Sequence, residues 1–457
     1  MAFWTRSLEA EMRYEKYISV PDAIWFDVVP DSWRALKMRG VFSERNTKVS
    51  DKDYPALSVG KMGVVPQLDT AVKTDNGDNR KLICKGDFAI NSRSDRKGSS
   101  GISQYDGSAS LIITVLKPHR SLNGRFYHYL LRGHYFAEEF YRNGHGLVSD
   151  LWTTKWDEMR NIYIPVPPRE EQDQIVRYLD WQVSKINKLI HGYQWKIKLL
   201  EERRQTIIDQ TSLEGVDGVK LIDSGTHWVK QIPENWKMVY SKKLFAERKD
   251  KAFLNDEQLT ASQKHGVISQ KEFMEKVGRR VTVVTKGGDI LKHVGKGDFI
   301  ISMRSFQGGL EYSYVEGKIS SAYVMLIPRK GLVYDEYFKW LLKSTPYIKA
   351  LQGTADLVRD GQALRYANFA KVPLPQVPID EQKRIADYIE QETARIDRAI
   401  PVLEKEIELL KEYRTRLISD VVTGQMDVRN VEVPEYTPEE DIAEEAPEEQ
   451  EVEMDAD

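Results

Sequence analysis

The amino-acid sequence contains the same pattern twice, and this duplication constrains the fold more than any other feature. A set of aromatic, proline and charged residues near the start recurs after a constant displacement of 203 positions. The first set is Trp25, Pro30, Trp33, Phe42, Glu44 and Arg45, and the second is Trp228, Pro233, Trp236, Phe245, Glu247 and Arg248. Because so many matches keep their order, we expect two copies of one structural unit.

The duplication continues to the end of each copy. The later matches are Lys85–Phe88 with Lys296–Phe299, Arg93 with Arg304, Gly98 with Gly309, and Glu171-Gln172 with Glu381-Gln382. These pairs are displaced by 210 or 211 positions, so the second copy carries an insertion of eight residues before Lys296. Nearly the whole chain therefore belongs to the repeat.

The first part of each copy has the composition of an α+β domain. About 26–165 and 229–373 mix short β-branched or aromatic runs with turns rich in Gly, Asn, Asp and Pro, and each contains a short amphipathic helix. Runs such as Ser110–Leu116 and Ser321–Ile327 are typical of strands. The pattern predicts two tandem α+β domains of about 140 residues each.

The second part of each copy is predicted to be one long helix. Apolar residues alternate spacings of three and four, which is the seam of a coiled coil. The seam residues include Leu179, Ile186, Ile190, Ile197 and Arg204 in copy one, and Ile389, Ile396, Ile400, Ile407 and Arg414 in copy two. The apolar stripes must face another helix, and the two equivalent arginines are expected to orient the pair.

The order of the elements favours an antiparallel helix pair. Each helix, from Gln172 to Gln210 and from Gln382 to Asp420, rises about 57 Å at ~1.5 Å per residue. An antiparallel pair that joins and separates the two domains would have a pseudo-twofold axis. Two similar domains related in this way suit duplex DNA, whose half-sites recur at about 34–36 Å per turn.

These observations predict six segments. They are an N-terminal segment at 1–25, a first domain at 26–165, a first helix at 166–213, a second domain at 214–374, a second helix at 375–424 and an acidic disordered tail at 425–457.

Charge and composition limit the classes of protein to which this chain can belong. The chain has 67 basic and 70 acidic residues, but twelve acidic residues lie in Pro434–Asp457, so the remainder has about nine excess positive charges. This excess permits a polyanion partner. No apolar stretch is long enough to cross a bilayer or to act as an export signal, and Cys84 is the single cysteine. We therefore expect a cytoplasmic protein without disulfides or a metal centre.

Three motifs resemble one known family. They are Asp223–Trp236, the Pro-x-x-Glu-Gln starts at Pro168–Gln172 and Pro378–Gln382, and the helix end at Leu417–Gly424. In these motifs, and in the order domain, helix, domain, helix up to about residue 430, the chain resembles the specificity subunit of type I restriction-modification systems, which defend cells against foreign DNA.

The resemblance implies a non-catalytic DNA-binding subunit. In the family, each target-recognition domain recognises one half of an interrupted, asymmetric DNA site, and the helices set the gap. The helices also dock modification subunits, which methylate adenine. Two modification subunits are expected in the complex, and restriction subunits join the assembly. The chain is then expected to bind no cofactor itself, while S-adenosylmethionine, ATP and Mg belong to the partner subunits.

Two surfaces in each domain are candidates for DNA contact, because Arg, Lys, Gln and Ser on exposed loops supply phosphate and base contacts. The first follows the shared Lys-Gly-Asp-Phe strand, and the second precedes the long helix. The candidates on the first are Arg93, Ser94, Arg96 and Lys97 in copy one and Arg304, Ser305 and Gln307 in copy two; on the second they are Arg142, Lys155, Arg359, Gln362 and Arg365. A solvated basic turn, or packing on the helix start, is the alternative for each.

Two other functions stay open at this point. The chain could be a coiled-coil scaffold that binds protein, or it could modify DNA by itself. The sequence has no phosphate-binding P-loop and no Asn/Asp-Pro-Pro-aromatic run typical of amino-methyltransferases. Asp87 and Asp298 follow glycines and precede Phe88 and Phe299, so they are predicted to be turn residues rather than a nuclease site.

Overall fold

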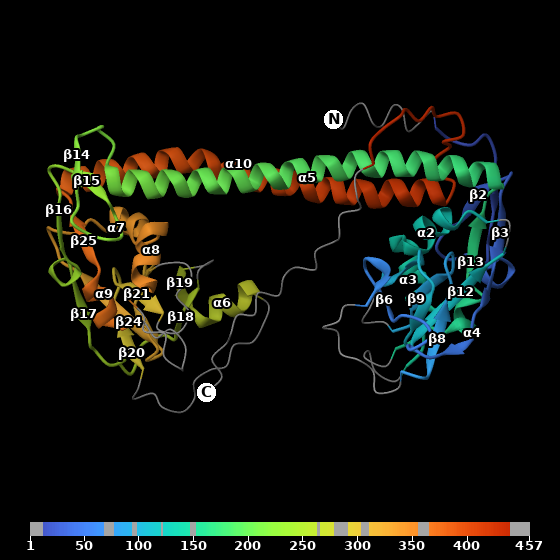
Figure 1. Ribbon diagram of the computed structural model, residues 1–457, viewed down its shortest axis with the longest axis horizontal. Coiled ribbons are helices and arrows are strands. Elements are labelled where there is room, and N and C mark those ends of the chain that lie inside the picture. The colour runs from blue at the N-terminus through green and yellow to red at the C-terminus, as the bar shows by residue number, and fades with distance from the viewer. Residues whose placement is uncertain are drawn as a thin grey trace. The chain divides into compact units, whose positions relative to one another are not determined.

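The computed structural model describes residues 12–67, 77–93, 98–119, 122–146, 152–262, 266–277, 291–302, 310–354 and 365–438. Contacts divide them into two compact units, one within 1–194 and 404–449 and the other within 195–403. Each unit holds one α+β domain with parts of both long helices, and each is described by itself (Figure 1). The mixed α and β character predicted from the sequence is confirmed.

Within its described residues, domain 1 contains short strands and three short α-helices. Its strands are β1 (Tyr17–Ser19), β2 (Val28–Pro30), β3 (Arg34–Lys37), β4 (Phe42–Glu44), β5 (Lys48–Val49), β6 (Leu57–Gly60), β7 (Gly63–Pro66), β8 (Arg80–Ile83), β9 (Phe88–Asn91), β10 (Ser100–Ile102), β11 (Gly107–Ala109), β12 (Ile113–Pro118) and β13 (Tyr163–Val166). Its helices are α2 (Gly124–Arg132), α3 (His134–Arg142) and α4 (Trp156–Met159). The central sheet has the antiparallel order β10-β9-β12-β4.

Domain 2 repeats this arrangement. Its strands are β14 (Leu221–Asp223), β15 (Gln231–Pro233), β16 (Lys237–Tyr240), β17 (Phe245–Arg248), β18 (Leu259–Ser262), β19 (Gly266–Ser269), β20 (Lys292–Val294), β21 (Phe299–Ser302), β22 (Glu311–Tyr312), β23 (Gly317–Ile319), β24 (Tyr323–Pro328) and β25 (Pro373–Gln376). Its helices are α6 (Gln270–Val277), α7 (Asp335–Leu341), α8 (Thr345–Gln352) and α9 (Tyr366–Lys371). The order β17-β24-β21-β22 matches the central sheet of domain 1 strand for strand.

A buried ion pair accounts for several of the repeated residues. Asp87 is 2% exposed and accepts hydrogen bonds from Arg45 Nε at 2.6 Å and from the Cys84 backbone N–H at 2.9 Å. In domain 2, Asp298 Oδ2 accepts from Arg248 Nε at 2.6 Å and from Gly295 N–H at 2.8 Å. The hydrogen bond to Asp87 raises the pKa of Arg45. Both aspartates therefore fix the turn before β9 or β21, as predicted, and they have a structural role.

The long helices are α5 (Arg169–Glu214) and α10 (Ile379–Val422). Acidic residues occupy the first turn of both, where the helix dipole favours negative charge. In unit 1, Tyr178 and Asn187 of α5 contact Met426 and Arg414, so the helices run antiparallel there. None of the helices within the described ranges is both long enough and apolar enough to cross a bilayer.

The predicted seam residues contribute to this packing. Leu179, Ile186, Ile190, Ile389, Ile396 and Ile407 are buried, and Ile197 and Ile400 are half-buried. In unit 2, Ile208 and Leu213 of α5 and Ile385 and Ile389 of α10 belong to one core with Phe245, Phe299 and Phe338 of the domain. The helices are thus part of the domain core rather than a separate layer.

The first copy starts earlier than predicted. Tyr17–Ser19 pairs with β2 in the way that Leu221–Asp223 pairs with β15, so residues 17–19 are the counterpart in copy one of strand β14. The residue types differ because these strands are largely exposed and are held by backbone hydrogen bonds. Residues 17–19 of the predicted N-terminal segment therefore belong to domain 1, whereas residues 1–11 lie outside the described part of the chain.

The chain also stays folded beyond the predicted end of the second helix. Met426 and Val428 are 6% and 0% exposed, and Gln174 Nε2 donates hydrogen bonds to the carbonyl groups of Val428 and Val431 at 2.9 and 2.8 Å. The Asp427 N–H donates to Met12 O at 2.8 Å. The prediction of a disordered tail from residue 425 is wrong for 425–431, and residues 439–457 lie outside the described part of the chain.

Two glycines provide a stability test of these assignments. Gly424 has φ +76°, and a Cβ there would collide with the ring of Pro30, whereas a Cβ at Gly192, inside α5, has nothing within 4 Å. We expect Gly424→Ala to lower the free energy of unfolding by more than about 1 kcal/mol, because a left-handed alanine is strained. Gly192→Ala should raise it by about 0.5–1 kcal/mol, since alanine favours the helix.

Urea denaturation of the full chain, followed by tryptophan fluorescence, measures both changes. Equal effects of the two substitutions would contradict the packing of the segment after α10 on Pro30.

Candidate nucleic-acid interface

The structure brings parts of the two predicted surfaces of domain 1 together. The backbone of Thr153 forms β-bridges with Arg93 and with His145, and Thr153 lies two residues before Lys155. Arg93, His145 and Lys155 are all exposed. Arg93 and Lys155, predicted separately from the sequence, therefore belong to one surface. Thr153 was missed, because a backbone bridge leaves no signal in residue type.

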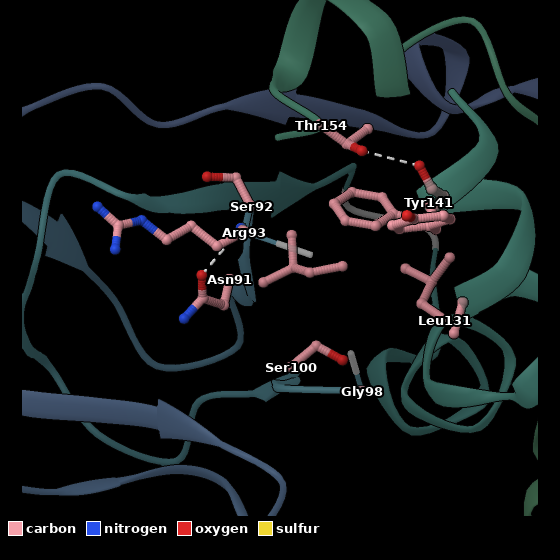
Figure 2. Close-up of a pocket in the computed structure, with 11 residues that line it drawn as sticks. Asn91, Ser92, Arg93, Gly98, Ser100, Leu131, Tyr141 and Thr154 are labelled. Atoms are coloured by element: carbon pink, nitrogen blue, oxygen red, sulfur yellow. Dashed lines mark hydrogen bonds between the residues drawn. The ribbon is translucent and has the colours of Figure 1, made fainter. Parts of the chain in front are cut away.

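Figure 2 shows the base of this surface. A small pocket beneath it is lined by Ser92, Ser100, Leu131 and Thr154, while the Arg93 side chain extends away from the pocket. The Arg93 N–H donates to Asn91 Oδ1 at 3.1 Å, and Thr154 Oγ1 donates to Phe140 O at 2.8 Å. These bonds hold the backbone and leave the Arg93 guanidinium exposed.

Unlike the exposed Arg93 side chain, the Arg142 side chain is paired with a carboxylate of its own domain. Its guanidinium forms two hydrogen bonds, of 2.7 and 2.8 Å, with the carboxylate of Glu139, which is 8% exposed. This bond to Glu139 raises the pKa of Arg142. Asn143 Nδ2 also donates to Glu139, at 2.9 Å. Arg142 thus neutralises a buried carboxylate.

Lys155 and Arg365 are counterparts in the two copies. Each stands at the N-cap of a short helix, α4 or α9, and each donates its backbone N–H to the third residue of that helix. The acceptors are Glu158 Oε2 at 2.9 Å and Asn368 Oδ1 at 3.0 Å. Both cations are exposed, so the duplication retains a basic side chain at this position of each domain.

The remaining candidates lie outside the described residues. They are Ser94, Arg96 and Lys97 in copy one and Arg304, Ser305, Gln307, Arg359 and Gln362 in copy two. Among the residues that the structure does describe, no group of three His, Cys, Asp or Glu side chains could hold a metal ion.

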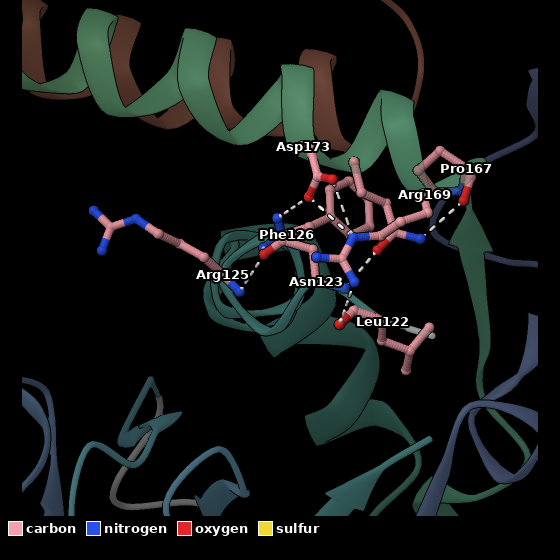
Figure 3. Close-up of polar contacts among 8 residues, drawn as sticks. Leu122, Asn123, Arg125, Phe126, Pro167, Arg169 and Asp173 are labelled. Atoms are coloured by element: carbon pink, nitrogen blue, oxygen red, sulfur yellow. Dashed lines mark hydrogen bonds and ion pairs between the residues drawn. The ribbon is translucent and has the colours of Figure 1, made fainter. Parts of the chain in front are cut away.

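The glutamine of the Pro-x-x-Glu-Gln motif joins each long helix to its domain. Gln172, 2% exposed, accepts the Asn123 N–H at 2.9 Å and donates to Pro167 O at 2.9 Å. Gln382, fully buried, accepts the Tyr334 N–H at 2.7 Å and donates to Leu332 O and Val377 O. Next to Gln172, the side chains of Asn123 and Arg169 also donate hydrogen bonds to the carboxylate of Asp173 (Figure 3). The motif therefore fixes the direction in which each helix leaves its domain.

The two seam arginines bind the opposite helix. In unit 2, Arg204 Nε donates to Asp397 Oδ1 at 2.7 Å, and in unit 1, Arg414 donates to Asn187 Oδ1 at 2.9 Å. Asn187 and Asp397 are themselves 210 positions apart, as are the arginines. In unit 2 the arginine comes from α5 and its partner from α10, and in unit 1 the arginine comes from α10 and its partner from α5. This repetition supports the hypothesis that the arginines orient the helix pair.

Comparison with known proteins gives one consistent result. The chain is 21% identical over 429 residues to a Methanocaldococcus jannaschii protein named as the MjaX specificity subunit of a type I restriction enzyme, covering 88% of this chain and 95% of that protein. It is 22% identical over 289 residues to the MjaVIII specificity subunit of the same organism, covering 59% and 64%. The chain resembles type I restriction enzyme specificity subunits. No family model matches it.

The likeness extends to the fold. A solved chain from a study of complex assembly and conformational transition in the type I restriction-modification system superimposes with a TM-score of 0.64 at 15% identity. The superposition covers 87% of this chain and 99% of that one. Most of this chain therefore shares the fold of that solved chain.

The contacts of Arg93 and Arg142 predict different consequences for stability. Arg142→Gln should lower the free energy of unfolding by about 1–3 kcal/mol, because it removes a charged partner from a buried carboxylate. Arg93→Gln should change it by less than about 0.5 kcal/mol, since an exposed side chain is removed. Thermal unfolding monitored by circular dichroism distinguishes the two, and a large loss for Arg93→Gln would show that Arg93 is structural.

Proposed function

We propose that this chain is the specificity subunit of a type I restriction-modification complex. It binds DNA sequence-specifically and has no catalytic role of its own. Each domain recognises one half of a bipartite, asymmetric site, and the long helices set the gap between the halves. Methyl transfer, with S-adenosylmethionine, and cleavage, with ATP and Mg, belong to partner subunits.

The observation that carries this proposal is the extent of the similarity. The alignment with the MjaX specificity subunit covers 88% of this chain and 95% of that protein, so the similarity is not limited to one short module. The domain order, the paired helices and the excess of basic residues outside the tail are all consistent with DNA recognition.

An asymmetric site follows from the differences between the copies. The domains share their sheets and the ion pairs at Asp87 and Asp298, which hold the fold, whereas the loop after the shared strand differs at most positions. Direct recognition of bases depends on the side chains of exposed loops. Domains with the same scaffold and different loops would therefore recognise different half-sites.

The outward surfaces of the helices support docking of modification subunits. Leu199 and Leu409 are counterparts in the two copies, and they are 46% and 48% exposed. Trp195 and Val402 are also exposed, at 59% and 60%. Large apolar side chains on a solvated helix are a common mark of a protein interface. Equivalent apolar positions on two helices suit two copies of one partner.

Methylation mapping tests the division between the domains. We expect co-expression with the neighbouring modification subunit to methylate adenines in an interrupted motif, detected by long-read sequencing of host DNA. Exchange of residues 26–165 for those of a related subunit should change one half of the motif, and exchange of 214–374 should change the other half. A continuous palindromic motif would contradict two separate recognition domains.

A deletion tests the role of the helices as a spacer. Removal of the equivalent residues 194–197 and 404–407 shortens each helix by about 6 Å, close to two base pairs at ~3.4 Å each. We expect the gap in the methylated motif to shorten while both half-sites stay unchanged. An unchanged gap in an active deletion variant would show that the helices do not set the spacing.

A further inference from the structure

A basic surface lies on domain 2 where three backbone segments meet. They are the 3-10 helix η4 (Ser241–Lys243), the residues that follow β24, and the short helix α9 (Figure 1). The Ser241 hydroxyl donates a hydrogen bond to Val372 O, just after α9, and the Arg329 N–H donates to Leu244 O at 2.8 Å. These bonds join the segments. The exposed cations on them are Lys242, Lys243, Arg329, Lys330, Arg365 and Lys371.

The six cations of this basic surface have no carboxylate partner. Among the described residues of the chain, none of the six forms an ion pair. Glu247 of β17 is an acidic residue close by, because burial and the charge of Glu247 raise the pKa of Tyr366 in α9 while Arg329 lowers it. The Glu247 carboxylate is paired with Lys249 at 3.8 Å, which is not one of the six.

Copy one has fewer cations at the equivalent positions. Lys243 and Lys371 of the basic surface correspond to the neutral residues Gly40 and Asn161. Arg329 corresponds to a histidine, His119. The displacements are 203 positions for η4 and 210 for the two later segments, as in the rest of the repeat. Three cations of domain 2 are therefore absent from domain 1.

Copy one also has acids where copy two has none. The counterpart of α9 is α4, and its first turn contains Asp157 and Glu158, whereas the first turn of α9 has no acidic residue. Asp157 binds Arg160 at 3.3 Å, and Glu158 lies 3.4 Å from His145. Cations and acids of domain 1 thus pair with each other at the place where domain 2 carries unpaired positive charge.

We propose that this basic surface binds the sugar-phosphate backbone of DNA beside the half-site that domain 2 recognises. The inference rests on the proposed function and extends it, because it gives domain 2 more phosphate contacts at this place than domain 1. Neighbouring like charges repel each other and destabilise a fold, and a bound polyanion removes this repulsion.

The residue types favour DNA over a protein partner. Lysine is a common donor to phosphate oxygens, whereas it is depleted in protein–protein interfaces. Arg365, predicted from the sequence as a candidate for DNA contact, stands at the start of α9 and Lys371 at its end. The basic surface is therefore continuous with the candidate nucleic-acid interface of domain 2.

Replacement of two cations that copy one lacks tests the proposal. The variant is Lys243→Gln with Lys371→Asn. The matched control is Lys220→Gln with Lys230→Gln, since these two lysines are also exposed and without ion pairs, and they flank the hairpin of β14 and β15 in the same domain. The assay is the affinity of the complex with modification subunits for fluorescent duplexes with and without the methylated motif, measured over a range of salt concentrations.

We expect the slope of log K against log[salt] to become shallower by about 0.9 for each lost phosphate contact in Lys243→Gln with Lys371→Asn, and to stay unchanged in the control. The affinity for both duplexes should fall by the same factor and the methylated motif should not change, because phosphate contacts carry no base information. Thermal unfolding confirms that each variant is folded. Should the double variant prove unstable, Lys242→Gln gives the same test alone.

Three results would overturn the inference. One is a salt slope in the variants equal to that of the unaltered complex, and another is the same change of slope in the control, which would reflect the net charge of the domain. The third is loss of co-purification with modification subunits at an unchanged salt slope, which would assign the surface to an acidic protein partner. If the unaltered complex shows no salt-dependent binding of DNA, the proposed function itself fails, and this outcome is distinct from all three.

Discussion

The buried glutamine at the start of each long helix is the contact on which the architecture depends. Gln172 and Gln382 satisfy backbone groups of the domain and of the segment that enters the helix, at positions with almost no access to water. A buried polar group left unpaired costs about 1–3 kcal/mol, so each helix is held in one direction from its domain. The proposed recognition of two half-sites at a fixed spacing requires such rigidity, since a hinge at this point would leave the gap between the half-sites undefined.

The packing of the helices extends this constraint to the rest of each unit. In unit 2, α5 and α10 share one core with the sheets, and in unit 1 the segment after α10 packs against the start of α5 and the N-terminal strand pair. Arg204 with Asp397 and Arg414 with Asn187 repeat one contact with the copies exchanged. Each domain is thus completed by parts of both helices, one from its own copy and one from the other.

Divergence between the copies separates structure from function. The ion pairs at Asp87 and Asp298, the paired strands and the glutamines are retained, because any change there would leave a buried charge or backbone group without a partner. The exposed loops differ in residue type, because solvent can satisfy exposed polar groups. In copy two, the acids Glu311 and Asp397 form ion pairs with Lys343 and Arg204, and these contacts stabilise the fold.

The sequence by itself determined the duplication, the α+β class, the long helices and the basic candidates, because periodicity and residue order are local properties of the chain. It also indicated that Asp87 and Asp298 belong to turns. Only the tertiary structure decided that Thr153 joins Arg93 to Lys155, that Arg142 is bound to Glu139, and that residues 17–19 and 425–431 complete domain 1. These contacts join residues distant in sequence through backbone pairing and burial, and such contacts depend on the folded arrangement rather than on residue type.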